Sequence, residues 1–256
     1  MSNSLTNFLD FDPNHIRFGE TFDGTYKKII PIGIFHEDNI NQLILSTPSN
    51  LLSFGVQEIR DKEKSNVIGY QLPICLWGKK KVSNEERIFT RKMEEMLSYI
   101  KEFLYTLKDE IDINDEMINN IQILNYKYEN GKRCEDKGPI LYTKLLMNNR
   151  TQKIVTTFID DETKSEINPL SLLNTKGTVK SAIKIENIII GKRIVIQVKL
   201  FEVLFKKLPT YSEKPRVKHS LLNPKIKLTF KKKNNTEMIP ESEEKDSQPV
   251  ELQPLS

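Results

Sequence analysis

Cysteine, tryptophan and long apolar runs are scarce in this chain. The 256 residues include 2 Cys and 1 Trp, and Cys75 and Cys134 form neither a CxxC pair nor a spacing typical of zinc ligands. Two isolated cysteines exclude a disulfide-built scaffold. No apolar run approaches the roughly 20 residues that a membrane-spanning helix requires. The N-terminus also lacks the basic start and apolar stretch of a secretion signal. We therefore expect an intracellular protein with reduced thiols and no membrane partner.

Catalytic motifs are missing as well. His15, His36 and His219 lie far apart in the sequence, and there is no glycine-rich phosphate loop, no GxSxG and no HExxH. Each histidine is more typical of a surface or packed residue than of a ligand. Acidic clusters at 109–115 and 160–162 would suit Mg²⁺, although solvated turns have the same composition. We predict no catalytic residue, no metal and no cofactor, and keep a Mg²⁺-dependent enzyme acting on nucleic acid as the least favoured alternative.

Basic charge is concentrated in the second half of the chain. From Lys176 to Lys233 there are sixteen Lys or Arg against three acidic residues, and from Glu237 to Glu251 there are six acidic residues against one Lys. A cationic surface binds nucleic acid through its phosphates, and a tethered acidic segment competes for that surface at high effective concentration. We expect a polyanionic partner and a tail that weakens its binding. A tail that merely improves solubility is the alternative.

Composition predicts one large domain with tails at both ends. We expect an irregular N-terminal arm over residues 1–28, a nucleic-acid-binding domain over 29–205 and a basic extension over 206–233. Residues 234–256 should form an acidic disordered tail, because they combine low hydrophobicity with high charge.

Alternating apolar and polar residues predict a mainly β fold. Residues 66–77 alternate clearly and should form a strand with one face toward the core. Residues 140–147 and 153–159 resemble a pair of strands around a turn at 148–150. Pro31 and Pro48 should lie at an edge or at the end of a strand.

One long amphipathic helix interrupts this pattern. The sequence Ser83-Asn84-Glu85-Glu86 is a capping box, and apolar residues then recur at helical spacing to about Asp109. A short second helical stretch is expected within 114–124.

The clearest hairpin is predicted between Val179 and Leu200, with a two-residue turn at Gly191-Lys192. Its polar face carries Lys180, Lys184 and Lys199, and Lys192 and Arg193 stand at its tip. Such a basic strip suits a phosphate backbone. Lysines that discourage edge-to-edge pairing produce the same pattern.

Single-strand binding also requires rings on which bases stack beside cations. Tyr142 and Lys144 share a strand face, and Trp77 precedes Lys79-Lys80-Lys81. Tyr70 lies on the apolar face of its strand, so core packing is its alternative role, and burial under the helix is the alternative for Trp77. The candidate nucleic-acid-binding residues are Tyr70, Trp77, Lys79, Lys80, Tyr142, Lys144, Lys180, Lys184, Lys192, Arg193 and Lys199.

Several motifs occur in an order that resembles the single-stranded-DNA-binding proteins of nucleocytoplasmic large DNA viruses, which are related to phage OB-fold single-strand binders. They are Leu43-Ile44-Leu45-Ser46-Thr47-Pro48, Phe54-Gly55-Val56, Gly69-Tyr70-Gln71-Leu72, the helix that begins near Glu86, and the stretch from Leu173 to Leu204. This resemblance implies an OB-fold-like, partly open β-barrel with one inserted helix. Related phage proteins end in an acidic tail with a terminal aromatic residue that docks the replication machinery, whereas this chain ends in Leu255-Ser256.

The resulting hypothesis is a non-catalytic, sequence-tolerant binder of single-stranded DNA. The resemblance implies that it protects unwound template in viral DNA replication, recombination and repair, within the host cell cytoplasm. Replication proteins that bind the acidic tail, a homo-oligomer and packaging in the virion are compatible with it. The alternative is a structural or scaffolding virion protein that holds the genome through a basic surface. Such a protein should bind duplex and single strands alike.

Overall fold

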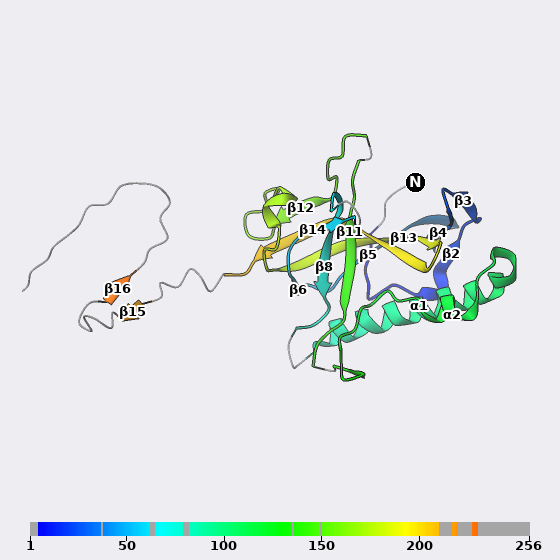
Figure 1. The fold of residues 1–256 in the computed structure, drawn as a ribbon, viewed down its shortest axis with the longest axis horizontal. Helices are drawn as coiled ribbons and strands as arrows, with labels where there is room; N and C mark the ends of the chain where they lie inside the picture. Colours follow the sequence, from blue (N-terminus) through cyan, green and yellow to red (C-terminus); the bar gives the residue numbers. More distant parts are fainter. Residues whose placement is uncertain are drawn as a thin grey trace, which may run out of the picture. The chain divides into compact units, whose positions relative to one another are not determined.

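The computed structural model describes residues 5–36, 38–61, 65–78, 82–134, 136–148 and 150–209, together with the backbone of two short strands nearer the C-terminus. One large mixed sheet dominates the described residues (Figure 1). Its strands are β1 (Leu5–Thr6), β2 (Ile16–Phe18), β3 (Phe22–Gly24), β4 (Lys27–His36), β5 (Asn39–Ser46), β6 (Leu51–Ser53), β7 (Gln57–Arg60), β8 (Val67–Cys75), β11 (Ile140–Leu145), β12 (Thr157–Asp160), β13 (Gly177–Ile190) and β14 (Ile194–Lys207). The prediction of a mainly β fold is confirmed.

Two small strand pairs complete the β structure of the described residues. β9 (Tyr128–Glu129) pairs with β10 (Lys132–Arg133), and β15 (Val217–His219) pairs with β16 (Lys227–Thr229). The chain divides into a compact unit that ends at Leu208 and a second unit that begins at Pro209. The predicted acidic tail over 234–256 lies outside the described residues.

Five strands of the large sheet close into a ring. β13 pairs with β6, β6 with β8, β8 with β11, β11 with β14, and β14 returns to β13. The β11–β14 pair is parallel and the other four pairs are antiparallel. Side chains that point into the ring, such as Leu72, Leu141 and Leu200, are fully buried. The sheet is therefore partly closed around its own apolar core.

The long β13–β14 hairpin is bent by two bulges. Ile185 pairs with Val198 and Asn187 with Gln197, which leaves Glu186 as an extra residue, and Phe201 is the extra residue on β14. Each extra residue increases the local twist and shifts the alternation of faces by one position. The loop at the tip contains Gly191, Lys192 and Arg193, because Ile190 pairs with Ile194. The predicted hairpin is present, but its turn has three residues rather than two.

The two prolines behave differently from each other. β5 ends before Thr47-Pro48, as predicted, and β6 continues along the same edge of β13. Thr47 Oγ1 accepts a hydrogen bond of 2.9 Å from Ser181 N, which fixes this corner. Pro31 lies inside β4 instead of ending a strand. The strand tolerates it at the point where β4 leaves β13 and pairs with β2 and β5.

The N-terminal residues are part of the core. Residues 1–28 were expected to be irregular, but they contribute β1, β2 and β3, and bury Phe8, Phe11 and Ile16. Strands of two or three residues are too short to show a repeating pattern in the sequence. Phe18 stacks on Phe103 of the long helix, with ring centroids 3.7 Å apart.

The predicted helix is α1 (Asn84–Ile111), and both halves of its capping box form between Ser83 and Glu86. Its apolar face joins the core of the sheet, and Asp112 ends it in a left-handed conformation. The short α2 (Asp115–Asn119) follows with Asn114 as its N-cap. Figure 1 shows α1 running alongside the sheet, with α2 near its C-terminal end. Within the described residues, no helix has both the length and the apolar character needed to cross a bilayer.

β11 and β12 form where the two strands were predicted, but they do not pair with each other along their length. Only the segments next to the turn are joined, by a bridge between Met147 and Ile154 and by hydrogen bonds from Val155 N to Leu146 O and from Asn148 N to Lys153 O. Both strands instead lie parallel to β14, with Lys144 opposite Lys199 and Thr157 opposite Glu202. Strand pairing over this distance in the sequence depends on tertiary packing, which local turn residues do not reveal.

Candidate nucleic-acid interface

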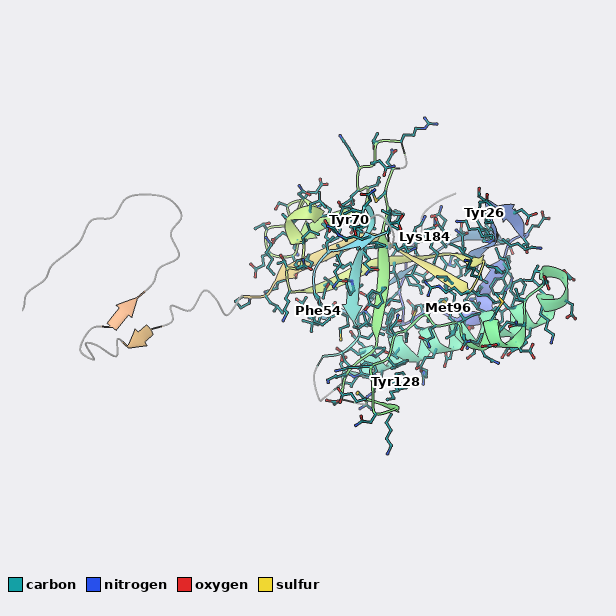
Figure 2. The ribbon with its side chains drawn as sticks, in the orientation of Figure 1. Tyr26, Phe54, Tyr70, Met96, Tyr128 and Lys184 are labelled. Atoms are coloured by element: carbon teal, nitrogen blue, oxygen red, sulfur yellow. The ribbon has the colours of Figure 1, made fainter. Side chains whose placement is uncertain are left out.

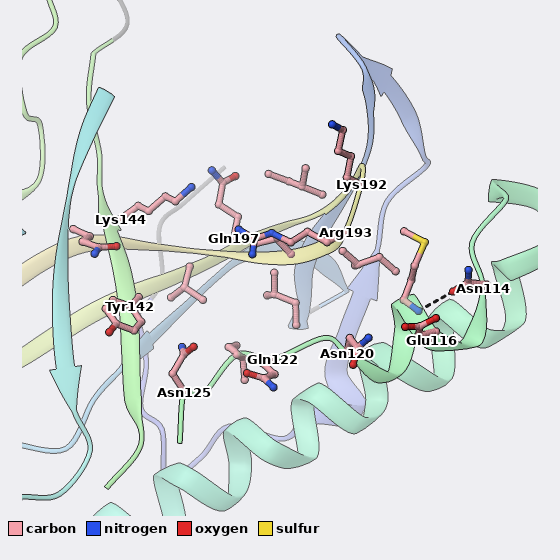
Figure 3. A pocket seen from close by; sticks show the side chains of 18 residues that line it. Asn114, Glu116, Asn120, Gln122, Asn125, Tyr142, Lys144, Lys192, Arg193 and Gln197 are labelled. Carbon is pink, nitrogen blue, oxygen red and sulfur yellow. Dashed lines mark hydrogen bonds between the residues drawn. The ribbon is translucent and has the colours of Figure 1, made fainter. Parts of the chain in front are cut away.

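A groove opens where β11 and β14 separate. Only Lys144 and Leu145 of β11 pair with β14, opposite Lys199 and Leu200. Residues 194–198 of β14 pair with β13 along one edge and have no strand partner on the other edge among the described residues. The space beside this edge has a volume of about 810 Å³. It is bounded by β8, β11, the β13–β14 hairpin and residues 114–125 (Figure 3).

One side of the groove is cationic. Lys144 extends from β11 toward the hairpin, and Lys192 and Arg193 line the groove from the hairpin tip (Figure 3). The pKa of Lys144 lies below its ordinary value, first because the site partly desolvates it and then because Lys199, Lys27 and Arg193 repel its charge. A lysine with a lowered pKa among other cations is in a site that favours an anion.

A row of three lysines continues this cationic side across the sheet. Lys144 lies opposite Lys199, and Lys199 lies opposite Lys184, so the three side chains share one sheet face. Glu186 forms ion pairs with Lys199 and with Lys184, the latter at 2.9 Å. Burial acts to raise the pKa of Glu186, but hydrogen bonds from Lys199 and Lys184 outweigh it and the pKa is lowered. The bulge at Glu186 thus places one carboxylate between two lysines.

The other sides of the groove are rich in side-chain amides. Carboxamides donate and accept hydrogen bonds, so they suit the mixed polar edges of nucleobases. Residues 114–125 are held by buried Ile118, Ile121 and Ile123 and by a bond of 2.9 Å from Lys101 Nζ to Asn119 O. Their outward residues therefore face the groove on a fixed backbone. The amides that line it are Gln71, Asn114, Asn120, Gln122, Asn125 and Gln197.

Tyr142 supplies a ring to the same groove. It lies on β11 opposite Pro73 of β8 and is 40% exposed, so part of the ring is accessible. Lys144 is two residues along the same strand and on the same face. Glu116 is the one acidic residue among the described groove-lining residues.

The structure brings together only part of the predicted set. Tyr142, Lys144, Lys192 and Arg193 line the groove, and Lys184 and Lys199 extend its cationic face. Lys180 lies on the same face of β13, four residues and thus about 13 Å from Lys184. There it borders a smaller hollow with Asp161.

The two aromatic candidates for which burial was the alternative role, Tyr70 and Trp77, face the core. Tyr70 packs against the apolar cluster, on the sheet face opposite to Gln71. Trp77 packs there too, and its indole Nε1 is buried with no hydrogen-bond partner in the described part of the chain. Neither ring lies in the groove. Lys79 and Lys80 lie outside the described residues.

The amide residues were not predicted as a set. Asn114, Asn120, Gln122 and Asn125 follow no motif, and α2 with the segment after it positions them. The alternation of buried Ile121 and Ile123 with exposed Gln122 was the available signal.

In both acidic clusters, carboxylates form ion pairs or hydrogen bonds with neighbouring protein groups. Asp115 pairs with Lys108 at 3.1 Å, and Asp160 accepts hydrogen bonds from the backbone N–H groups of Glu162 and Thr163. Glu162 pairs with Lys206 at 3.0 Å. Among the described residues, no group of three or more His, Cys, Asp or Glu is arranged to hold a metal ion.

Fold and site together define a mainly β protein with an open groove that is cationic on one side and amide-rich on the others. Residues 12–248 match the family described as "Protein of unknown function (DUF2738)", and the chain belongs to this family. It is also 27% identical over 168 residues to "Uncharacterized protein 007R" of Invertebrate iridescent virus 3. That match covers 64% of this chain and 36% of the viral protein, so the chain corresponds to about a third of its relative. Neither description states an activity.

Proposed function

We propose that this protein binds single-stranded DNA, without sequence specificity, in the groove between β11 and the β13–β14 hairpin. The observation that carries the proposal is the convergence of Lys144, Lys192 and Arg193 with the ring of Tyr142. Cations along a groove neutralise phosphates, and an accessible ring stacks on any base, which gives affinity without a sequence code. The similarity to a protein of an iridescent virus supports a viral setting, and we propose that the bound DNA is viral DNA undergoing replication, recombination or repair.

The position of the groove in the fold supports the same proposal. OB-fold proteins are five-stranded, partly open Greek-key barrels. They bind oligonucleotides on their second and third strands and on the loops that join strands one to two and four to five. In the ring described above, β8 and β11 come second and third in the chain. Gln71, Tyr142 and Lys144 come from these strands, and Lys192 and Arg193 from the loop between the last two. We therefore propose an OB-like barrel, with α1 inserted between its second and third strands.

Fluorescence anisotropy with a labelled oligo-dT tests the proposed function. We expect binding at low salt and a preference for oligo-dT over a duplex of equal length. The logarithm of the binding constant should fall linearly with the logarithm of the salt concentration. Lys144→Glu and Arg193→Glu should each weaken binding and reduce the salt slope by roughly 0.7 for each phosphate that is no longer neutralised. Lys153→Glu, an exposed lysine that does not line the groove, is the matched control. Absence of binding by the wild-type protein at low salt would remove the proposal.

A structural or scaffolding protein of the virion is the second candidate. Its support is the set of lysines that lie outside the groove, at the far end of the hairpin: Lys176, Lys180, Lys206 and Lys207. A basic surface of this kind would hold duplex and single strands equally, because no base needs to stack. Equal competition by duplex and by oligo-dT would favour this candidate.

A further inference from the structure

Tyr26 is the most exposed large hydrophobic residue among the described residues, at 98%. It lies in the two-residue loop between Gly24 of β3 and Lys27 of β4, and its φ is +60°. A bulky residue in the left-handed region is strained, and Gly or Asn is the usual occupant. The ring makes no packing contribution that would offset this strain. Such an outlier justifies a functional hypothesis.

The surroundings of Tyr26 indicate what that function is. Lys28 lies opposite Ile190, so the β3–β4 loop lies beside the tip of the β13–β14 hairpin. A Cβ atom on Gly191 would be 3.9 Å from Tyr26 O and 4.0 Å from the Cβ of Lys27. Lys192 and Arg193 follow Gly191, and Figure 3 shows Lys192 next to the ribbon of β3 and β4. The loop that carries Tyr26 therefore lies beside the hairpin tip that forms the cationic end of the groove.

The electrostatics connect this loop to the groove. Lys27, the residue after Tyr26, and Arg193 are both close enough to Lys144 to repel its charge. Lys144, Arg193 and Lys27 are thus near enough to interact, Tyr142 is two residues from Lys144, and Tyr26 precedes Lys27. Alternating cations and accessible rings are what a single strand with splayed bases requires.

We propose that Tyr26 is a second base-stacking platform, on which an unpaired nucleobase stacks where the strand leaves the groove over the hairpin tip. This inference rests on the proposed function and extends the binding site beyond the groove. The occupant of the ring is a nucleobase, because bases stack on aromatic rings. The phosphates of the same strand would contact the neighbouring Lys27, Lys192 and Arg193 instead.

The test compares Tyr26→Asn with the wild-type protein on two probes. Asn tolerates the left-handed conformation, so the variant should fold with an undiminished melting temperature. On oligo-dT its Kd should rise about 5- to 150-fold, the range for one lost stack. On a deoxyribose-phosphate chain of equal length that carries no bases, both proteins should bind equally. Tyr26→Phe should bind oligo-dT like the wild type.

Tyr128→Asn is the control, because Tyr128 is also exposed, at 59%, but lies on β9, well apart from Tyr26 in Figure 2. It should leave both affinities unchanged. The inference is wrong if Tyr26→Asn binds oligo-dT normally, if it weakens both probes equally, or if Tyr128→Asn has the same effect. If the wild-type protein does not bind oligo-dT, the proposed function fails as well. If Lys144→Glu weakens binding while Tyr26→Asn does not, only the inference fails.

Discussion

Glu186 limits the positive charge of the sheet face that extends the cationic side of the groove. It neutralises Lys184 and Lys199, whose side chains are only 17% and 25% exposed. Its carboxylate therefore lies between the two ammonium groups and, under the proposed function, competes with a phosphate for them. The β-bulge in β13 places Glu186 there, because the extra residue changes the direction of the side chain.

Glu186→Gln should raise the affinity for oligo-dT at low salt, because both lysines become available to phosphates. The salt slope should steepen by roughly 0.7 for each additional phosphate that is neutralised. The free energy of unfolding should fall, since the two lysines lose their counterion. Glu162→Gln, which releases Lys206 away from the groove, is the matched control and should leave the affinity nearly unchanged. Weaker binding by Glu186→Gln would show that the carboxylate positions the lysines for the ligand.

Lys144 should make binding sensitive to alkaline pH. Its pKa is below the ordinary lysine value, so it loses its proton at lower pH than an unperturbed lysine. The groove then loses one positive charge, and affinity should fall as pH rises through this lowered pKa. Lys144→Arg should abolish that part of the pH dependence, because arginine stays protonated. Anisotropy with an oligo-dA probe, whose bases do not titrate in the alkaline range, measures the effect.

Lys180→Arg, outside the groove, is the control for that measurement. It should retain the pH dependence of the wild-type protein. Identical alkaline profiles for Lys144→Arg and the wild type would mean that Lys144 does not contact the ligand.

At the scale of single residues, sequence patterns predicted which residues share a face of a strand. Alternation correctly placed Tyr142 and Lys144 on one face, because each strand residue points opposite to its neighbour. The positions of Trp77 and Tyr70 were ambiguous, because a ring on a strand suits a core as well as a surface. Tyr26 gave no signal at all, because exposure and φ are properties of the folded chain.

At the scale of elements, the helix was the most predictable part. The capping box fixed the start of α1 at Ser83, and a period of 3.6 residues over a long segment is hard to mistake. The hairpin was also predictable, but its bulges were not. A bulge changes which residues face the core without changing the composition of the strand, so Ile188 and Ile190 are buried in place of the odd-numbered positions that precede them.

Elements that depend on distant partners were the least predictable. The β11–β14 pair joins residues far apart in the chain, and its short overlap is what opens the groove. No local pattern encodes where two such strands separate. The N-terminal strands have the same origin, because Phe8 and Phe11 acquire their role only by packing under the rest of the sheet.

At the scale of the molecule, the local concentration of charge says more than the net charge. The formal net charge is only +4, yet Lys144, Lys184, Lys192, Arg193 and Lys199 gather on or beside one groove. This concentration is the basis on which we propose a polyanionic partner. The acidic segment from Glu237 to Glu251 lies outside the described residues, and competition between it and the ligand stays a prediction.

Photo-crosslinking measures most directly which residues contact the bound DNA strand. The full-length protein is irradiated with a 4-thiothymidine oligonucleotide at low salt, and the adducted peptides are mapped by mass spectrometry. We predict adducts on β11 around Tyr142 and on the β3–β4 loop at Tyr26, suppressed by Lys144→Glu and Arg193→Glu. Adducts confined to residues beyond Leu208, or to the far end of the hairpin around Lys180, would contradict a binding site in the groove.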